Sequence, residues 1–272
     1  MNKWLILILV VPCVMGSTVA IGSGVNTTSL DAQGIIDKIN TRDEGAAIKR
    51  ILTIQMINAK GKIRTRTAQV YRGNESERTR TLISFIKPRS VKNMSFLTYD
   101  QIDPEKQDSQ WLYLPALKKS RRIPSSNIHD SFLGTTFSYK DVKVEFKIDQ
   151  IAYKFKLKSI DEEKQMAVVI GTTLSDIEAE RMGHYAFQIQ VDMKSWIPTE
   201  VIYFEKNGSK QKTMTLNDIH KIEDIWTPRI IESLDHSNNN KTVFTYTDIQ
   251  YLDGFDETVF DVKRLGRANK IR

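Results

Sequence analysis

Alternation of apolar and polar side chains is the feature of this sequence that most restricts its fold. It runs through residues 52–56, 151–158 and 185–192, where nearly every second residue is Leu, Ile, Met, Tyr, Phe or Val. Successive side chains of a strand point to opposite faces of a sheet. These segments therefore predict strands with one apolar and one solvated face.

Polar turns separate further segments of the same kind, as in the Gly-containing stretch 58–61. Three isoleucines at helical spacing predict one amphipathic helix at about residues 30–42. No proline-rich linker interrupts the pattern, so we predict one large antiparallel sheet over about residues 46–250. The expected strands are 48–57, 62–72, 78–87, 94–100, 110–115, 150–159, 166–173, 184–192, 199–206, 210–219, 226–234 and 241–250.

A sheet of this width that is apolar on one face must be covered or must close on itself. Because the sequence contains few long helical patterns, we predict a strongly curved sheet with short helices over its concave side. Such a fold leaves either a gap that suits an apolar guest or a fully packed core without a cavity, and the periodicity fits both. The residues predicted to form the apolar inner face are Leu52, Ile54, Met56, Tyr153, Phe155, Leu157, Tyr185, Phe187 and Ile189.

The sequence contains no familiar catalytic motif. Cys13 is the single cysteine, and the four histidines show no metal-ligand spacing, so we predict no catalytic residue, no metal site and no cofactor. The net charge of +7 is modest and is spread along the chain. We therefore expect neither an enzyme nor a nucleic-acid-binding protein.

Residues 1–20 have the layout of a secretory signal peptide. Lys3 precedes a short apolar run, and small residues lead to Ala20. The run is shorter than the roughly 20 residues that a transmembrane helix needs. We predict a cleaved signal peptide at 1–20 and a single domain over 21–272; the alternatives are an uncleaved anchor and acylation of Cys13.

The middle of the chain resembles the bacterial outer-membrane lipoprotein-sorting protein family, a LolA-like group. The resemblance rests on segments 85–100, 110–123 and 131–141, which include the strings WLYLPALKKSRRI and SFLGTTFSYKD. It implies a mainly β, LolA/LolB-like incomplete barrel in the periplasm, with an apolar cavity for lipid or for the acyl chains of a lipoprotein. It further implies transport towards the outer membrane and an inner-membrane transporter of the RND/MMPL type as a partner.

Two groups of residues near the central segment are further candidates for a site. Phe132 and Phe137 are candidate lid residues over the open side of the sheet. The basic residues Lys118, Lys119, Arg121 and Arg122 are candidates for contact with an anionic surface, or form an ordinary solvated hairpin end. The strand at 110–115 is apolar on both faces, so the sequence does not decide which face meets the cavity.

Two functions follow from these observations. The first is a periplasmic carrier of lipid or acylated lipoprotein. The second is a non-catalytic accessory or scaffold subunit of an envelope transporter, without cargo of its own.

Overall fold

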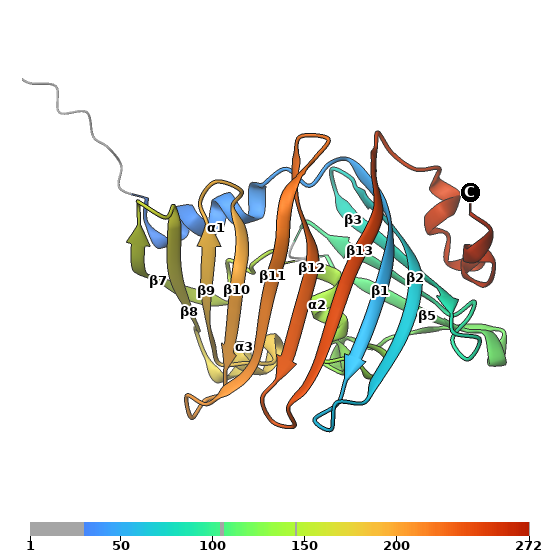
Figure 1. The fold of residues 1–272 in the computed structure, drawn as a ribbon, viewed down its shortest axis with the longest axis horizontal. Coiled ribbons are helices and arrows are strands. Elements are labelled where there is room, and N and C mark those ends of the chain that lie inside the picture. Colours follow the sequence, from blue (N-terminus) through green and yellow to red (C-terminus); the bar gives the residue numbers. More distant parts are fainter. Residues whose placement is uncertain (1–29, 104–105, 145, 272) are drawn as a thin grey trace, which may run out of the picture. The chain divides into compact units, whose positions relative to one another are not determined.

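An open antiparallel sheet of 13 strands dominates the part of the chain that the structure describes (Figure 1). The structure is a computed structural model that describes residues 30–103, 106–144 and 146–271. The predicted signal peptide at 1–20 lies outside these residues, as does Cys13. Among the described helices, none combines the length and the apolar character needed to cross a membrane.

The strands follow one another as neighbours, with one exception. The order is β6-β5-β4-β3-β2-β1-β13-β12-β11-β10-β9-β8-β7, so β1 pairs with β13 at the centre, and β6 and β7 are the two edges. The strand bounds are β1 Ala47–Ile57, β2 Ile63–Asn74, β3 Arg78–Lys87, β4 Ser95–Gln101, β5 Ser109–Leu114, β6 Lys119–Arg122, β7 Tyr153–Asp161, β8 Met166–Thr173, β9 Ala186–Asp192, β10 Ile197–Phe204, β11 Lys210–Ile222, β12 Ile225–Asp235 and β13 Asn240–Leu252.

Helices are short in the described chain. The bounds are α1 Ala32–Thr41, α2 Tyr139–Val144 and α3 Asp176–Met182, with 3-10 helices η1 Pro115–Leu117, η2 Ser125–Asn127, η3 Phe132–Gly134, η4 Glu257–Phe260 and η5 Val262–Lys270. The predicted helix at 30–42 is α1, whose N-cap Asp31 accepts a hydrogen bond from the Gly34 amide at 2.7 Å. The mainly β fold with an unclosed sheet is confirmed.

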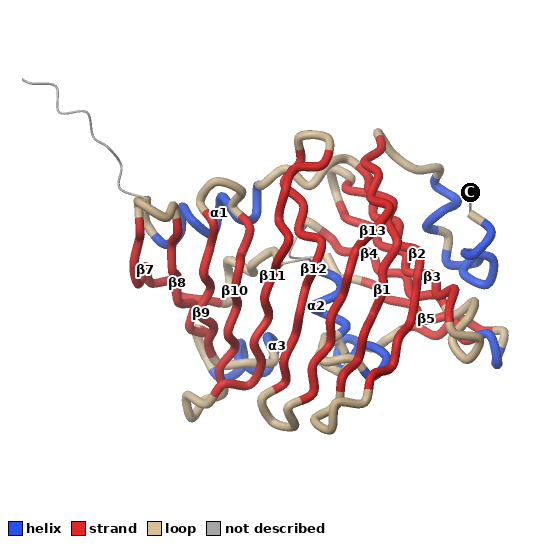
Figure 2. The backbone as a smooth tube through the Cα atoms, in the orientation of Figure 1, coloured by secondary structure: helices blue, strands red, loops and turns tan. Residues whose placement is uncertain are grey.

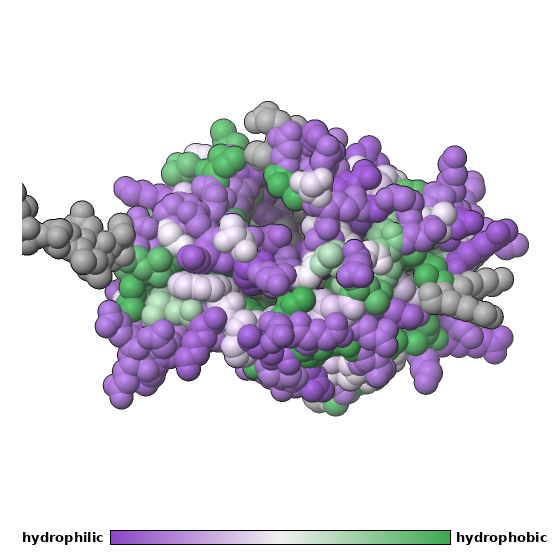
Figure 3. Space-filling view, turned by 90° about the horizontal axis from the view of Figure 1, so that it is seen from above, coloured by the Kyte–Doolittle hydropathy of each residue, from purple (hydrophilic) through white to green (hydrophobic). Residues whose placement is uncertain are grey.

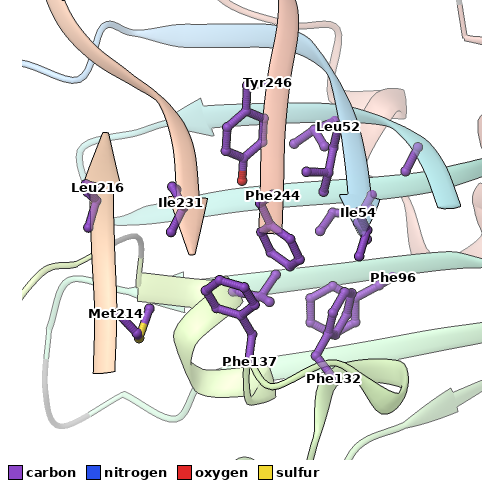
Figure 4. Packing of buried hydrophobic residues seen from close by; sticks show 14 of the residues in the cluster. Leu52, Ile54, Phe96, Phe132, Phe137, Met214, Leu216, Ile231, Phe244 and Tyr246 are labelled. Carbon is purple, nitrogen blue, oxygen red and sulfur yellow. The ribbon is translucent and has the colours of Figure 1, made fainter. Parts of the chain in front are cut away.

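The segment between β6 and β7 must pass from one edge of the sheet to the other, and it does so across the concave face (Figure 2). Its η3 and α2 place Phe132 and Phe137 against inward-facing side chains of β1, β3, β4 and β13 (Figure 4). Phe137 stacks on Phe244 with ring centroids 4.1 Å apart, and Phe132 contacts Phe96 edge to face at 5.2 Å. We call residues 131–144 the crossover plug.

The opposite face of β2–β5 is covered by the C-terminal 3-10 helices. Tyr71, Leu82 and Leu97 pack there against Phe260 and Leu265. The prediction placed helices on the concave side and did not include this second cover. The apolar residues of η5 and its end, Val262, Leu265, Ala268 and Ile271, recur at every third position, which is the period of a 3-10 helix and not the 3.6-residue period of an α-helix. This cover also settles the faces of β5: Trp111 and Tyr113 join this outer cluster, and Leu112 joins the inner one.

Most large apolar side chains are inside the described unit. The face drawn in Figure 3 is mostly hydrophilic, with hydrophobic residues in small groups and a hollow near its centre. Of the predicted inner-face residues, Leu52, Ile54, Tyr153, Phe187 and Ile189 are buried. Openings beside such buried apolar residues are the places to look for a site.

Candidate functional site

A cavity of about 660 Å³ opens to solvent on the inner side of the sheet half that contains β7 and β9–β12. The crossover plug forms its other wall. Its volume lies within the roughly 300–1,000 Å³ typical of small-molecule pockets. The residues that line it include His129, Phe137, Lys140, Asp141, Tyr153, Met182, His184, Phe187, Tyr203 and Lys212.

One wall of the cavity is aromatic. Phe187 of β9 pairs in register with Tyr203 of β10 and, on its other side, with Gly171 of β8. Tyr153 meets Phe187 edge to face at 5.0 Å, and Tyr203 lies 4.5 Å from the His184 ring. A Cβ at position 171 would lie 2.4 Å from Phe187 Cε1, so glycine there makes room for the ring. Strand register thus gathers aromatic rings that are far apart in the sequence.

Two of these side chains are hydrogen-bonded to each other. The Tyr153 hydroxyl lies 2.7 Å from His184 Nε2. Burial, with the positive charges of Lys140 and Lys212, lowers the pKa of His184 to about 3. Burial also raises the pKa of Tyr153 far above its usual value. Both groups are therefore neutral at pH 7, and the wall is polarisable and uncharged.

An ion pair joins the plug to the sheet at the cavity floor. Lys212 Nζ of β11 donates to Asp141 Oδ2 at 2.6 Å, and both side chains are mostly buried. The Ser138 amide donates to the same carboxylate oxygen at 2.7 Å, while Ser138 Oγ accepts from the Asp141 amide. Burial by itself would raise the pKa of Asp141, but the nearby Lys212 ammonium and these hydrogen bonds lower it overall. Asp141 is ionised at neutral pH.

Two further nitrogen side chains complete the floor. Lys140 Nζ donates to the Met182 thioether at 3.0 Å. The His129 ring nitrogen Nε2 is hydrogen-bonded to the Arg181 carbonyl at 2.8 Å, and burial followed by the Lys140 charge lowers the pKa of His129. We call His129, Lys140, Asp141, His184 and Lys212 the floor cluster. In the described chain, no group of three or more His, Cys, Asp or Glu side chains is placed to hold a metal ion.

The inner-face residues predicted from β1 lie away from this cavity. Leu52 and Ile54 are fully buried in the cluster that contains Phe132 and Phe137, and the half-buried Met56 packs against it. The concave face is sealed at this place, which is the packed-core alternative of the sequence analysis. The two predicted lid residues are themselves part of that core.

Of the six predicted residues in the other sheet half, two line the cavity and four do not. Tyr153 and Phe187 line it. The Phe155 ring lies 6.3 Å from that of Phe187, and Ile189, fully buried, is two residues further along β9. Leu157 follows on β7 and is half-buried. The half-buried Tyr185 ring contacts the Lys206 ammonium at 5.8 Å.

The predicted basic hairpin residues do not line the cavity. Lys118 follows η1 in a left-handed backbone conformation, and Lys119, Arg121 and Arg122 belong to the exposed edge strand β6. Arg122 Nη2 donates to Ser109 Oγ at 2.9 Å. Their side chains remain available to solvent at one edge of the sheet.

Sequence reasoning missed the floor cluster completely. Its members come from a loop, from the plug, and from the segment 184–212, and no spacing in the sequence connects them. Asp141 offered the one local signal, because Ser138 and Asp141 have the spacing of an N-terminal capping pair. That signal indicates a helix start and not a site.

Comparison with known proteins gave one family match and several matches of fold. A protein-family model whose description reads "-like: Uncharacterized protein" matches residues 77–267, more than half of the chain. No curated protein matches the chain.

Three solved structures illustrate the fold. A Vibrio parahaemolyticus domain named for outer membrane lipoprotein sorting has a TM-score of 0.76 at 23% identity, covering 87% of this chain and 98% of that one. A DUF1329 family protein from Desulfovibrio piger has a TM-score of 0.77 at 19% identity, covering 87% and 100%. A LolA superfamily protein from Nitrosomonas europaea has a TM-score of 0.63 at 15% identity, covering 86% and 98%.

Proposed function

Because this chain belongs to a LolA-like family, we propose that it is a periplasmic carrier that binds lipid, or the acyl chains of a lipoprotein, for transport towards the outer membrane. The signal-peptide layout of residues 1–20 supports export of the chain. A carrier needs a water-excluding space for its cargo and no reacting groups. A fold alone does not fix a cargo, so the support for a lipid cargo comes from the cavity.

The observation that carries the proposal is the aromatic wall beside an open volume of about 660 Å³. Tyr153, Phe187 and Tyr203 line this space from three strands, with the Phe187 ring almost fully buried against Tyr153. An apolar chain laid along the rings gains roughly 25 cal/mol for each Å² of apolar surface removed from water. The cargo site that we propose is therefore the β7 and β9–β11 half of the sheet, and not the sealed region around Leu52.

Bound lipid per chain tests the proposal. Organic extracts of the purified protein are analysed by mass spectrometry, and uptake of a fluorescent fatty acid is measured in parallel. Phe187→Gln places a polar group in the wall, and we expect it to weaken binding by roughly 10- to 150-fold, the equivalent of roughly 1.5–3 kcal/mol of lost aromatic burial. The matched control is Gln188→Ala, since Gln188 lies on the opposite face of β9 beside Lys158.

Thermal unfolding is measured for both variants, so that a loss of lipid is separated from a loss of fold. A folded Phe187→Gln protein that keeps its lipid would place Phe187 outside the binding surface. A wild-type protein without lipid, and without uptake of the fluorescent fatty acid, would contradict the carrier function itself.

A further inference from the structure

The exposed charges of this chain are sorted between the two ends of its sheet. In an antiparallel sheet every second turn lies at the same end. The turns β1–β2, β3–β4, β5–β6, β10–β11 and β12–β13 therefore share one end, which is the lower end in Figure 1. Ser209 and Ser237, from the last two of these turns, line the cavity. We call this end of the sheet the cavity end and the opposite one the far end.

Basic side chains dominate the cavity end of β1–β6. Each of its three turns carries two exposed lysine or arginine residues in the turn or directly beside it, and segments 58–62, 88–94 and 115–118 contain no acidic residue. These basic residues are Lys60, Lys62, Arg89, Lys92, Lys118 and Lys119.

The turns at the far end are acidic instead. The β2–β3, β7–β8 and β11–β12 turns each begin with two acidic residues or contain them. These residues are Glu75, Glu77, Glu162, Glu163, Glu223 and Asp224. The sheet is therefore electrically polar along its strands, and its positive end is the one that holds the cavity.

The lysines of the two ends also differ in their partners. At the far end Lys106, Lys164 and Lys221 each lie between 3.3 and 3.9 Å from a carboxylate. The six basic residues of the cavity end have no ion pair with any residue that the structure describes. Acidic residues do reach the cavity end at α3, but Asp176 pairs there with Lys206. The excess positive charge is therefore on the turns of β1–β6.

Two of these turns hold their lysines on a fixed backbone. Asn58 Oδ1 accepts from the amides of Lys60 at 3.1 Å and Lys62 at 2.9 Å. The Lys118 amide donates to the Pro115 carbonyl at 3.1 Å and closes η1. Protection of an edge strand from pairing would explain lysine in β6. It does not explain Lys60 and Lys62, because β1 and β2 lie in the middle of the sheet.

Exposed apolar side chains stand directly beside these lysines. Ile63 follows Lys62 and is 54% exposed, and Leu117 precedes Lys118 and is 48% exposed. Further exposed apolar residues of the cavity end are Ile151, Leu174 and Ile177. A nucleic acid would use the charges and not the aliphatic side chains. Lysine beside leucine or isoleucine suits the boundary between the headgroups and acyl chains of an anionic bilayer.

We infer that the cavity end docks on the surface of a lipid bilayer that contains anionic phospholipid. The lysines of the β1–β2 and β5–β6 turns approach the lipid phosphates, while Ile63 and Leu117 enter the boundary with the acyl chains. The same surface repels the acidic far end, which fixes the orientation of the protein. Docking brings the cavity to the bilayer, and in this consequence alone the inference rests on the proposed carrier function.

Cosedimentation with lipid vesicles tests the inference. Vesicles of phosphatidylcholine mixed with an equal amount of phosphatidylglycerol are compared with vesicles of phosphatidylcholine alone, at low and at high salt. The charge variant combines Lys60→Gln, Lys62→Gln, Lys118→Gln and Lys119→Gln. The matched control makes the same change in net charge at exposed positions of the far end, with Lys106→Gln, Lys164→Gln, Lys194→Gln and Lys221→Gln.

We expect the wild type to bind the phosphatidylglycerol vesicles, and high salt to weaken this binding. The charge variant should bind at least about a hundredfold more weakly, since each lysine near an anionic surface contributes roughly fivefold. The control should bind like the wild type. A strand of 12 residues such as β2 spans roughly 40 Å, so the far end lies well beyond the Debye length of about 10 Å.

A second pair of variants tests the apolar contacts. Ile63→Ser combined with Leu117→Ser should weaken vesicle binding by about tenfold, because two partly exposed side chains lose their burial in the bilayer. The matched control is Ile102→Ser combined with Leu252→Ser, at exposed positions of the far end, and it should bind like the wild type. Thermal unfolding confirms that all four variants are folded.

Several results would overturn the inference. Equal losses in the cavity-end and far-end charge variants would do so, as would equal binding to vesicles without phosphatidylglycerol. A wild-type protein that binds polyglutamate and no vesicles would overturn it in favour of an acidic protein partner. Dodecanoate titration without vesicles keeps the two proposals apart, since all variants should bind dodecanoate like the wild type. Binding to anionic vesicles without binding of dodecanoate would contradict the carrier function and support the docking surface.

Discussion

Replacement of Phe132 by alanine tests whether the crossover plug is a fixed part of the core or a lid that opens. Phe132 is fully buried, and its ring contacts Phe96 at 5.2 Å, Tyr139 at 5.4 Å and Phe85 at 6.5 Å. The backbone around it is tied down as well, because the Phe132 amide donates to the Phe137 carbonyl at 2.7 Å. These contacts describe a core residue.

The expected loss of stability can be built from these contacts. Removal of a buried aromatic side chain loses its transfer free energy, leaves a cavity and removes aromatic pairs worth about 0.5–1.5 kcal/mol each. Such changes typically lower the free energy of unfolding by about 3–5 kcal/mol. For a chain of this size that corresponds to a fall in Tm of roughly 6–20 °C.

Thermal unfolding followed by circular dichroism measures this fall, and dodecanoate titration follows the site. The control is Ile177→Ala, because Ile177 is 77% exposed and its truncation should change stability by less than about 0.5 kcal/mol. A Tm for Phe132→Ala within a few degrees of wild type, together with tighter ligand binding, would refute the reasoning. The plug would then be a weakly held lid whose opening limits access to the cavity.

Three further outcomes are expected from the site. Asp141→Asn should lower the free energy of unfolding by about 1–3 kcal/mol, since it leaves Lys212 without its carboxylate. Because the pKa of Asp141 is lowered in the folded state, this stability is present above the unfolded pKa and is lost as the pH falls through the folded pKa. Urea titrations of the wild type and the variant should therefore give the same free energy of unfolding in acid. His184 should show no titration of its ring proton signals in NMR spectra between pH 5 and 8, and a ring that titrates near 6.5 would show that it is not buried as described. Because its folded pKa of about 3 lies below the ordinary 6.5, the free energy of unfolding should fall as the pH drops from 6.5 towards 3, by up to about 1.4 kcal/mol per pH unit. Gly171→Ala should lower the free energy of unfolding by about 1–3 kcal/mol, and with it the Tm, because the new Cβ contacts the Phe187 ring. Adding Phe187→Leu should restore part of the loss. A Gly171→Ala protein as stable as the wild type would show that the ring has room to move.

The sheet could be predicted from the sequence because its strands obey one rule. Side chains alternate between two environments, so the alternation in 52–56 and 185–192 marked strands that the structure contains in β1 and β9. Strand β6 escaped prediction because all four of its residues are exposed, and a strand without a buried face shows no alternation. Helix α3 has seven residues, of which Met182 is buried and Ile177 is exposed, so it shows no clear helical period.

The candidate site could be predicted only in part. The apolar faces of β7 and β9 follow from alternation, so Tyr153 and Phe187 were found. The positions of η3 and α2 against the strands decide where the plug closes the concave face and where it leaves an opening. No local sequence pattern encodes these positions. The burial of Leu52 in the core and the position of Phe187 in the wall of a cavity therefore look the same in sequence. The Asp141–Lys212 pair joins residues brought together only by the folded sheet.

The pairing of β1 with β13 divides the folding of this chain into the formation of local hairpins and the joining of two hairpin series. Every other pair of neighbouring strands in the described sheet is consecutive in sequence, so β1–β6 and β7–β13 are two series of local hairpins. The partners Ile51 and Thr247 are about 200 residues apart, and closing so long a loop is slow compared with forming a hairpin. We therefore expect each series to form before the two meet and the β1–β13 pair to form last. On that basis a substitution in this pair should mainly accelerate unfolding and change the rate of hairpin formation little.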